Sequence, residues 1–328
     1  MSEFRQDLVS GGWIIMAPER AKRPAELLGK KHKRKPSSKL NCPFEDLERT
    51  GNWPPILTYP DIDNWKLAII PNKFPALIHD PVCAIPLLKG PHLVSAGSGH
   101  HDLLVTRNHY KNFAHLTLDE AMQVFEAIQS RYRMLAKDKC LLYTSTFFNW
   151  GQSAGASLYH PHYQILTLPV IPPAVHHSLK GSERYYRKHR KCPHCVMIHW
   201  EEKEKKRVID ENQFAMSVSP FVPMQPFELK VFPKRHHPCF EKTPPGDLRA
   251  VVAVLQSALR RIEKHLHDPD LNFFIHTAPL KRQSSYGYYH WHIEVVPKIQ
   301  IPGGFELSTG IDINVVDPDR VAKILKGK

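Results

Sequence analysis

Two histidines and a glutamine alternate in the segment His160-Pro161-His162-Tyr163-Gln164. In a β-strand alternate side chains share one face, so the two imidazoles and the amide would project together. A neutral imidazole is a nucleophile at pH 7 without a separate base, and the Gln164 amide can donate a hydrogen bond to an anionic oxygen. Because proline cannot donate to a sheet ladder, Pro161 predicts that this strand lies at an edge or at a disrupted position near solvent.

A run of small residues, Gly151-Gln-Ser-Ala-Gly155-Ala-Ser157, comes just before this segment. Such residues allow backbone N–H groups and a hydroxyl to approach a bound phosphate closely. The charge balance agrees, because 45 Lys and Arg residues against 32 Asp and Glu residues give a formal charge of +13 and indicate an anionic partner. The basic run at 29–39 is expected to be a solvated loop with a second role in attracting anions.

Two other classes of protein fit the composition less well. A zinc-stabilised nucleic-acid-binding protein would share the positive charge, but the basic residues are scattered and no aromatic stacking motif accompanies them, so we expect no nucleic-acid partner. No apolar run approaches the ~18–20 residues of a membrane helix, and the N-terminus lacks the features of a signal peptide. We therefore expect no membrane partner and a cytoplasmic location.

The elements that would position these residues occur twice along the chain. The segments 101–109 and 227–236 each read as a strand that ends in histidine, and a helical pattern follows each of them. Thr117 and Glu120 have the spacing of a capping box at the start of the first helix. The β-rich segments 140–151 and 271–279 come next, followed by the His-x-His strands 160–169 and 290–299. The nearly equal spacing of the two sets indicates a tandem duplication.

We therefore predict an α+β fold in which antiparallel sheets carry helices packed on them. The first unit is expected to span residues 1–170 and the second residues 171–328, with 170–200 as the link, and the two sheets could be separate or joined. The second His-x-His strand reads His290-Trp-His292-Ile-Glu294. Because a carboxylate cannot donate to a phosphate and repels it, we assign catalysis to the first copy, and a structural or acceptor-binding role to the second.

The segment GASLYHPHYQI (155–165) resembles the active-site segment of galactose-1-phosphate uridylyltransferases, which belong to the histidine-triad superfamily. Further similar segments are ERAKRP (19–24), PNKFPAL (71–77) and NWGQSAGAS (149–157). From FFIHTAPL through YHWHIEVVP to GGFELSTG (303–310), the chain is more similar to the branch that contains ADP-glucose phosphorylase. The resemblance implies two histidine-triad-like units and a homodimer.

The resemblance also implies a ping-pong reaction. His162 would attack the α-phosphorus of a nucleotide sugar, release a sugar 1-phosphate and form a nucleotidyl-histidine, and a second phosphate acceptor would then reverse this step. Gln164 would assist by donating to a phosphoryl oxygen. The substrate-binding residues that the resemblance implies are Arg20, Arg23, Asn72, Asn149, Ser157 and Phe305.

Cys192-Pro-His-Cys195 has the spacing of metal ligands. The resemblance adds His236 and His290, which completes a four-ligand set suited to zinc. It also implies a site in the first copy, where the ligands would be Cys42, Glu45, His109 and His160. Because a glutamate replaces a thiolate there, we expect that site to be altered, weaker or empty. We expect no disulfide framework, and the remaining cysteines would be plain core residues.

The nucleotide and the acceptor are not determined by these motifs. The simplest expectation is a transfer of uridylyl groups between UDP-glucose and galactose 1-phosphate, in galactose metabolism. The alternative is an ADP-glucose phosphorylase-like enzyme that transfers an adenylyl group to phosphate.

Overall fold

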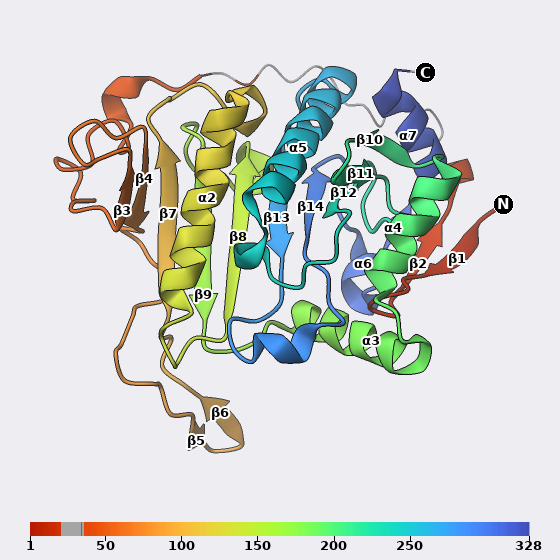
Figure 1. Cartoon of the computed structure of the whole chain (residues 1–328), viewed down its shortest axis with the longest axis horizontal. Coiled ribbons are helices and arrows are strands. Elements are labelled where there is room, and N and C mark those ends of the chain that lie inside the picture. Colours follow the sequence, from red (N-terminus) through yellow and green to blue (C-terminus); the bar gives the residue numbers. More distant parts are fainter. Residues whose placement is uncertain (21–33, 35, 328) are drawn as a thin grey trace.

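A single antiparallel sheet of ten strands forms the centre of the computed structural model, which describes residues 1–20, 34 and 36–327 (Figure 1). Across the sheet the strands follow the order β3 (Leu57–Tyr59), β4 (Leu67–Pro71), β7 (His100–Thr106), β9 (His162–Leu168), β8 (Tyr143–Trp150), β13 (Leu271–His276), β14 (His292–Pro297), β12 (Leu229–Pro233), β11 (Ala215–Val218) and β10 (Val208–Glu211).

The two halves of this sheet repeat one another in reverse order. They meet where β8 pairs with β13, and Phe147 lies opposite Phe274 at that junction. Corresponding rows of residues cross the sheet on one face, Ile70–Leu103–Gln164 in the first half and Val218–Lys230–Glu294 in the second. The duplication therefore forms one continuous sheet, a point that the sequence left open.

Helices α2 (Leu118–Leu135) and α5 (Pro245–Leu266) cover one face of the sheet, one helix over each half (Figure 1). The predicted capping box starts α2: the Thr117 hydroxyl accepts from the Glu120 N–H, and the Glu120 carboxylate accepts from the Thr117 N–H. Tyr163 and Ile165 of β9 are buried in the core beneath these helices. Since strand residues alternate, His162 and Gln164 face the opposite side, as expected.

The opposite face is covered differently in the two halves. In the first half the coil around Phe44 and Leu47 packs on Ala68 and Ile70. In the second half Ile198 of α4 (Pro193–Glu204) packs on Met216, Val218 and Phe232. The expected link, 170–200, thus forms α3 (Pro173–His189) and most of α4.

A smaller sheet flanks the second half (Figure 1). Its strands are β1 (Glu3–Gln6), β2 (Trp13–Met16) and β15 (Ile313–Asn314). The remaining helices are α6 (Gly304–Thr309) and α7 (Pro318–Lys326), together with η1 (Pro18–Arg20), η2 (Lys39–Asn41), η3 (Phe113–His115), η4 (Gln152–Ala154), η5 (Phe240–Lys242) and η6 (Gln283–Tyr286). Among the described residues no helix is long and apolar enough to cross a membrane.

The hairpin of β5 (Leu87–Lys89) and β6 (His92–Val94) projects from the first half (Figure 1). A disulfide joins Cys83, before this hairpin, to Cys140, just after α2, with a Cα–Cα distance of 5.1 Å. The expectation that these two cysteines are plain core residues was wrong. The two residues are 57 positions apart, and only the fold brings them together. Cys239 is a buried core residue, as expected.

The expectation that the His-x-His strand lies at a sheet edge, or at a disrupted position near solvent, was also wrong. β9 lies between β7 and β8 and pairs with both. The strand begins at His162, so Pro161 precedes it and removes no hydrogen bond from the ladder. A proline just before a strand is therefore compatible with an interior position.

We predict that Thr117→Ala lowers the free energy of unfolding by about 1 kcal/mol, because the first turn of α2 loses its side-chain acceptor. Glu126→Ala is the matched control, since Glu126 is exposed on the same helix and should change stability by less than about 0.5 kcal/mol. Urea denaturation followed by circular dichroism measures both effects. Equal stability of the two variants would contradict this role of the cap.

Candidate active site

His162 is the first residue of β9, and a backbone contact orients its ring. Nδ1 lies 2.9 Å from the carbonyl oxygen of His160, which can only accept, so Nδ1 carries the hydrogen and Nε2 keeps a free lone pair. The residue is 6% exposed, and burial lowers the pKa of His162 below its ordinary value. The ring is therefore neutral at pH 7, and Nε2 is the atom available for nucleophilic attack.

Gln164 lies on the same face of β9, and His101 of β7 fixes its amide. The Ala76 N–H donates to Nδ1 of His101 (3.1 Å), so Nε2 carries the hydrogen and donates to Oε1 of Gln164 (3.0 Å). The Asn72 amide nitrogen lies 3.4 and 3.1 Å from the two ring nitrogens, which places it over the ring face. The oxygen of Gln164 is thus occupied, and its NH2 group is left to donate to a substrate.

His101 is a functional residue that the sequence analysis did not single out. It lies within the predicted strand 101–109, but its partners Ala76 and Gln164 lie on either side of it in the chain, 25 and 63 residues away. The signal available was the polar run His100-His101-Asp102 at the start of a strand that continues with the apolar residues 103–105. Because such positions are often solvated strand ends, that signal alone does not indicate a site.

The loop between β8 and β9 has the backbone form that was expected of a phosphate-binding segment. Gly151 and Gly155 have φ values of 92° and 88°, which favour glycine. A Cβ on Gly151 would lie 1.8 Å from Oδ1 of Asp270, so this close approach also requires glycine. Oδ2 of Asp270 accepts from the Ser153 N–H (2.8 Å) and hydroxyl (2.6 Å), which ties the loop to the second half.

Asn149 turns its donor end toward this loop. The Asn272 side chain donates to Oδ1 of Asn149 (2.8 Å) and to the Ala154 carbonyl (2.8 Å). Since its oxygen is engaged, the Asn149 NH2 group is the end left over, and a Cβ on Gly155 would lie 3.5 Å from that nitrogen. The arrangement is suited to a phosphate contact, as the resemblance implied.

Arg34 lies beside the loop and belongs to the basic run that was expected to be solvated. It donates to Asp268 (2.9 and 3.0 Å) and Asp270 (2.7 Å), and its guanidinium lies 4.3 Å from the centroid of the Trp150 ring. The carboxylates are 234 and 236 residues away along the chain, so sequence proximity could not reveal them. This part of the run packs on the protein.

The other implied substrate residues are placed differently. Ser157 is exposed at the end of the loop, and Arg23 lies outside the described residues. Arg20 is exposed four residues after β2, and Phe305 is 43% exposed on α6. Figure 1 shows β2 and α6 beside the second half of the sheet, away from β9. Within the described part of one chain, no contact joins Arg20 or Phe305 to His162.

Four candidate metal ligands converge in the second half, with their ligand atoms within 4.8 Å of one another. They are Cys192, Cys195, His236 and His290. The Nε2 atoms of His236 and His290 each lie 2.9 Å from a backbone carbonyl, of Gly287 and Pro233, so both rings turn a free Nδ1 toward the thiols. Burial also lowers the pKa of His290 to about 4, so its ring is neutral. Two thiols and two imidazoles form a set that could hold a metal ion.

Cys42, Glu45, His109 and His160 form the corresponding group in the first half, also with their ligand atoms within 4.8 Å. Nε2 of His160 lies 2.7 Å from the Thr106 carbonyl, and Nε2 of His109 lies 3.0 Å from the Ser37 carbonyl. Oε1 of Glu45 lies 2.9 Å from Nδ1 of His109, so the carboxylate occupies the place of the second thiol. Burial raises the pKa of Cys42, which makes its thiolate harder to form without a cation.

In the second half, Glu294 occupies the place of Gln164. Its Oε2 lies 3.8 Å from Nζ of Lys230 and 3.3 Å from Nε2 of His276. Nδ1 of His292 lies 3.2 Å from the His290 carbonyl, which repeats the contact made by His162. The geometry of the strand is thus preserved, but the amide donor is present only in the first half.

Comparison with known proteins decides the family. The family model described as "Domain of unknown function (DUF4921)" matches residues 89–327. Galactose-1-phosphate uridylyltransferase of Thermotoga maritima is 26% identical over 335 residues, which cover 99% of this chain and 98% of that relative. ADP-glucose phosphorylase of Arabidopsis thaliana is 35% identical over 330 residues, which cover 99% of this chain and 92% of that relative. The chain belongs to the galactose-1-phosphate uridylyltransferase family.

A solved structure of this family has the same fold. The crystal structure of an ADP-glucose phosphorylase from Arabidopsis thaliana with bound ADP-glucose is similar with a TM-score of 0.84 and 33% identity, over 100% of this chain and 99% of that one. The predicted family and the α+β fold class are both confirmed. As a member of the uridylyltransferase family, the protein is a nucleotidyltransferase.

We predict that Gln164→Glu slows nucleotidyl transfer by about 10²–10³-fold, as when an oxyanion-hole donor is removed. The new carboxylate could not donate to a phosphoryl oxygen and would repel it. Gln123→Glu, on α2 and so on the other face of the sheet, is the control for added charge. Single-turnover rates measure the effect, and equal rates for Gln164→Glu and the wild type would show that this amide does not face the phosphate.

Proposed function

We propose that this member of the family moves a nucleoside monophosphate from a nucleotide sugar to a phosphate acceptor through a nucleotidyl-histidine on His162. The observation that carries the proposal is the state of that ring. His162 is buried and neutral, its Nδ1 is held by the His160 carbonyl, and Nε2 is the free atom. An imidazole in this state can attack phosphorus without a general base.

The proposed reaction has two displacements at one phosphorus. In the first, Nε2 of His162 forms a bond to the α-phosphorus, and the bond from that phosphorus to the sugar phosphate oxygen breaks. In the second, an oxygen of the acceptor attacks the same phosphorus, and the bond to Nε2 breaks. The Gln164 amide and the Asn149 amide supply hydrogen-bond donors to the nonbridging oxygens as charge develops on them. His101 acts as a positioning residue, because it holds the oxygen of Gln164 away from the phosphate.

Adenylyl transfer from ADP-glucose to phosphate is the activity that we favour. The supporting observation is the similarity to ADP-glucose phosphorylase, at 35% identity over 99% of this chain. The motifs alone favoured uridylyl transfer, so this similarity changes the order of the two candidate activities. Uridylyl transfer between UDP-glucose and a hexose 1-phosphate is the second candidate, supported by a uridylyltransferase relative that is 26% identical over a similar span.

Zinc is the metal that we propose for Cys192, Cys195, His236 and His290. Two thiolates and two imidazoles are the donors that a tetrahedral structural zinc site uses, and both rings are already oriented by backbone carbonyls. Bound there, zinc would supply folding free energy by joining α4 to the ends of β12 and β14. Zinc would bind more weakly to the group in the first half, because an oxygen replaces one sulfur there. That group consists of Cys42, Glu45, His109 and His160.

A homodimer is the assembly that we propose, with α6 of one copy near the active site of the other. Two observations support this arrangement. Phe305 is 43% exposed and Leu307 is 77% exposed, so α6 presents apolar surface. Phe305 also makes no contact with His162 within one chain, although the resemblance implies a substrate contact for it. Light scattering on the purified protein measures the mass of the assembly, and a monomer with full activity would reject this arrangement.

The mass of the covalent adduct identifies the nucleotide that the protein transfers. We predict that incubation with ADP-glucose alone, without acceptor, yields an adenylyl adduct in the intact mass, and that UDP-glucose yields less adduct or none. His162→Ala should form no adduct, because the nucleophilic nitrogen is gone. His292→Ala, the corresponding change in the second half, should form the adduct normally.

Two results of the adduct experiment would change the proposal. An adduct that forms only with UDP-glucose would replace the first candidate by the second. An adduct of normal yield in His162→Ala would overturn the proposed nucleophile and, with it, the proposed reaction.

The two metal sites should differ in affinity. We predict that the purified protein retains about one zinc per chain after mild chelation, because the site with two thiolates binds more tightly. Cys192→Ser should then lower the melting temperature more than Cys42→Ser. Elemental analysis and thermal unfolding measure these effects. Unchanged metal content and melting temperature in Cys192→Ser would contradict the assignment of the tighter site.

A further inference from the structure

A long segment, residues 72–99, connects β4 to β7 and carries the β5–β6 hairpin. From position 79 to position 97 every residue is exposed except Cys83 and Ala84, which are half-buried. Among the described residues, the two hairpin strands form hydrogen bonds only with each other. An isolated two-stranded hairpin is only marginally stable in water, so its place depends on what holds the rest of the segment.

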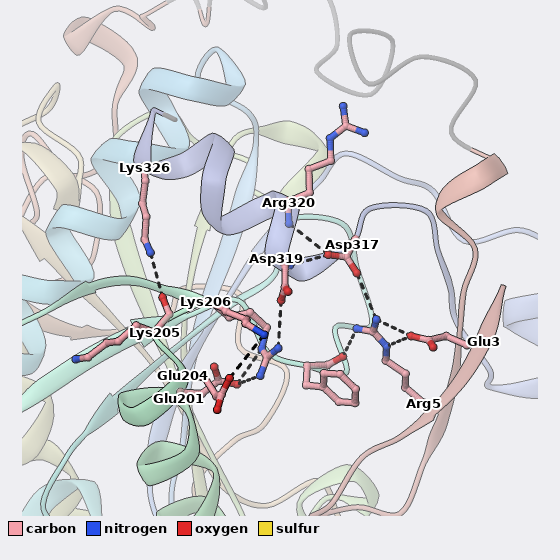
Figure 2. Close-up of polar contacts among 12 residues, drawn as sticks. Glu3, Arg5, Glu201, Glu204, Lys205, Lys206, Asp317, Asp319, Arg320 and Lys326 are labelled. Carbon is pink, nitrogen blue, oxygen red and sulfur yellow. Dashed lines mark hydrogen bonds and ion pairs between the residues drawn. The ribbon is translucent and has the colours of Figure 1, made fainter. Parts of the chain in front are cut away.

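Elsewhere, segments that are far apart in the chain are joined by strong ion pairs. Figure 2 shows such a pair between Arg5 of β1 and Asp317, which precedes α7. Within the described part of the chain, the segment 72–99 has a single ion pair, and its 3.7 Å exceeds hydrogen-bond length. The covalent bond between Cys83 and Cys140 is therefore the strongest connection between this segment and the turn after α2.

The turn that follows α2 holds the segment at two neighbouring points. Cys140 forms the disulfide, and its N–H donates to Oδ1 of Asp138 (2.8 Å), whose Oδ2 faces Nδ1 of His79. The ring of His79 also stacks on that of His100, with centroids 4.3 Å apart. Because Cys83 follows His79 by only four residues, the disulfide keeps His79 beside these two partners.

Ala76 lies between this anchor and the start of the segment. At the start, the Asn72 N–H donates to the His101 carbonyl (2.9 Å). Between the two anchors, the Ala76 N–H donates to Nδ1 of His101, which leaves Nε2 to donate to Oε1 of Gln164. The tautomer of His101, and with it the direction of the Gln164 amide, therefore depends on where Ala76 is held.

The other tautomer of His101 would reverse the amide. With its hydrogen on Nδ1, His101 would present a lone pair at Nε2, and the NH2 group of Gln164 would donate to it. Oε1 of Gln164 would then face the substrate and repel a phosphoryl oxygen. One backbone N–H thus selects between an amide that stabilises developing charge and one that opposes it.

We propose that Cys83 and Cys140 are positioning residues for nucleotidyl transfer, and that their disulfide makes the reaction sensitive to thiols. While the disulfide is formed, Ala76 is held against His101, and the NH2 group of Gln164 faces the phosphate. A thiolate opens the disulfide by attacking one sulfur, and a second thiol completes the exchange, so that two small thiols become a disulfide and two cysteine thiols form. The segment then keeps only noncovalent contacts, and His101 can change its tautomer. The inference rests on the proposed reaction, in which Gln164 donates to the phosphate.

Single-turnover adduct formation from ADP-glucose, with and without dithiothreitol, tests this proposal. We expect the reduced protein to react about three- to tenfold more slowly, which corresponds to losing the one hydrogen bond that selects the tautomer. Cys83→Ser should react at the reduced rate in both conditions, which also excludes an effect of the reagent on the metal site. Cys239→Ser is the matched control, because it removes a buried cysteine outside the disulfide, and it should keep the wild-type ratio of the two rates.

A disulfide that only stabilises the fold would slow every variant by the same factor. In Gln164→Glu the amide is gone, so reduction should cause no further loss of rate. The same ratio of oxidised to reduced rates in the wild type and in Gln164→Glu would overturn the positioning role. Equal rates of the wild type with and without dithiothreitol would overturn it as well.

Hydrogen exchange separates this inference from the proposed reaction, because the measurement needs no turnover. The amides of residues 72–79 should exchange faster after reduction, whereas those of β13 should not change. A protein that forms no adduct in the oxidised state would contradict the proposed reaction, and the exchange result would still report on the disulfide. Unchanged exchange at residues 72–79 would show that the disulfide does not hold Ala76, and the inference would be wrong.

Discussion

The antiparallel pairing of β8 with β13 is the interaction on which the rest of the structure depends. It joins two half-sheets into one, and Phe148 and Phe273, whose ring centroids are 5.0 Å apart, belong to a single core. Without this pairing each half would expose an unpaired edge strand. The pairing also brings Asp270 and Asn272 of the second half against the loop between β8 and β9 of the first. The loop between β8 and β9 is therefore held by residues of both copies.

Backbone carbonyls set the chemistry of the buried histidines in both copies. Nε2 of His160 and of His290 face the carbonyls of Thr106 and Pro233, so each ring offers Nδ1 to its thiol group. Two residues further along, the contact is reversed, because Nδ1 of His162 faces a carbonyl and Nε2 is left free. His160 of the candidate metal group and His162, the proposed nucleophile, thus have opposite tautomers although they are only two residues apart. Since the partners of these rings are backbone carbonyls, the assignments do not depend on mobile side chains.

The two copies differ in the side chains that lie next to these histidines. In the first, Gln164 is oriented by His101 and can donate to a phosphoryl oxygen. In the second, Glu294 lies beside Lys230, and an apolar cavity covers the neighbouring strands. A single substitution of amide by carboxylate removes the donor that phosphate chemistry needs.

The sequence by itself determined those features that depend on local spacing or on repetition. The alternation of His162 and Gln164, the capping box at Thr117 and the repeat of the His-x-His strand all follow from short-range geometry, and each is present in the structure. The resemblance named both ligand groups, whose members the fold brings together. Tertiary structure alone decided what depends on contacts between distant segments, such as the Cys83–Cys140 disulfide, the docking of Arg34 and the orientation of Gln164 by His101. The physical reason is that these contacts join segments that are far apart in the chain: β7 pairs with β9 and β8 pairs with β13, so the fold, and not local spacing, decides which side chains meet.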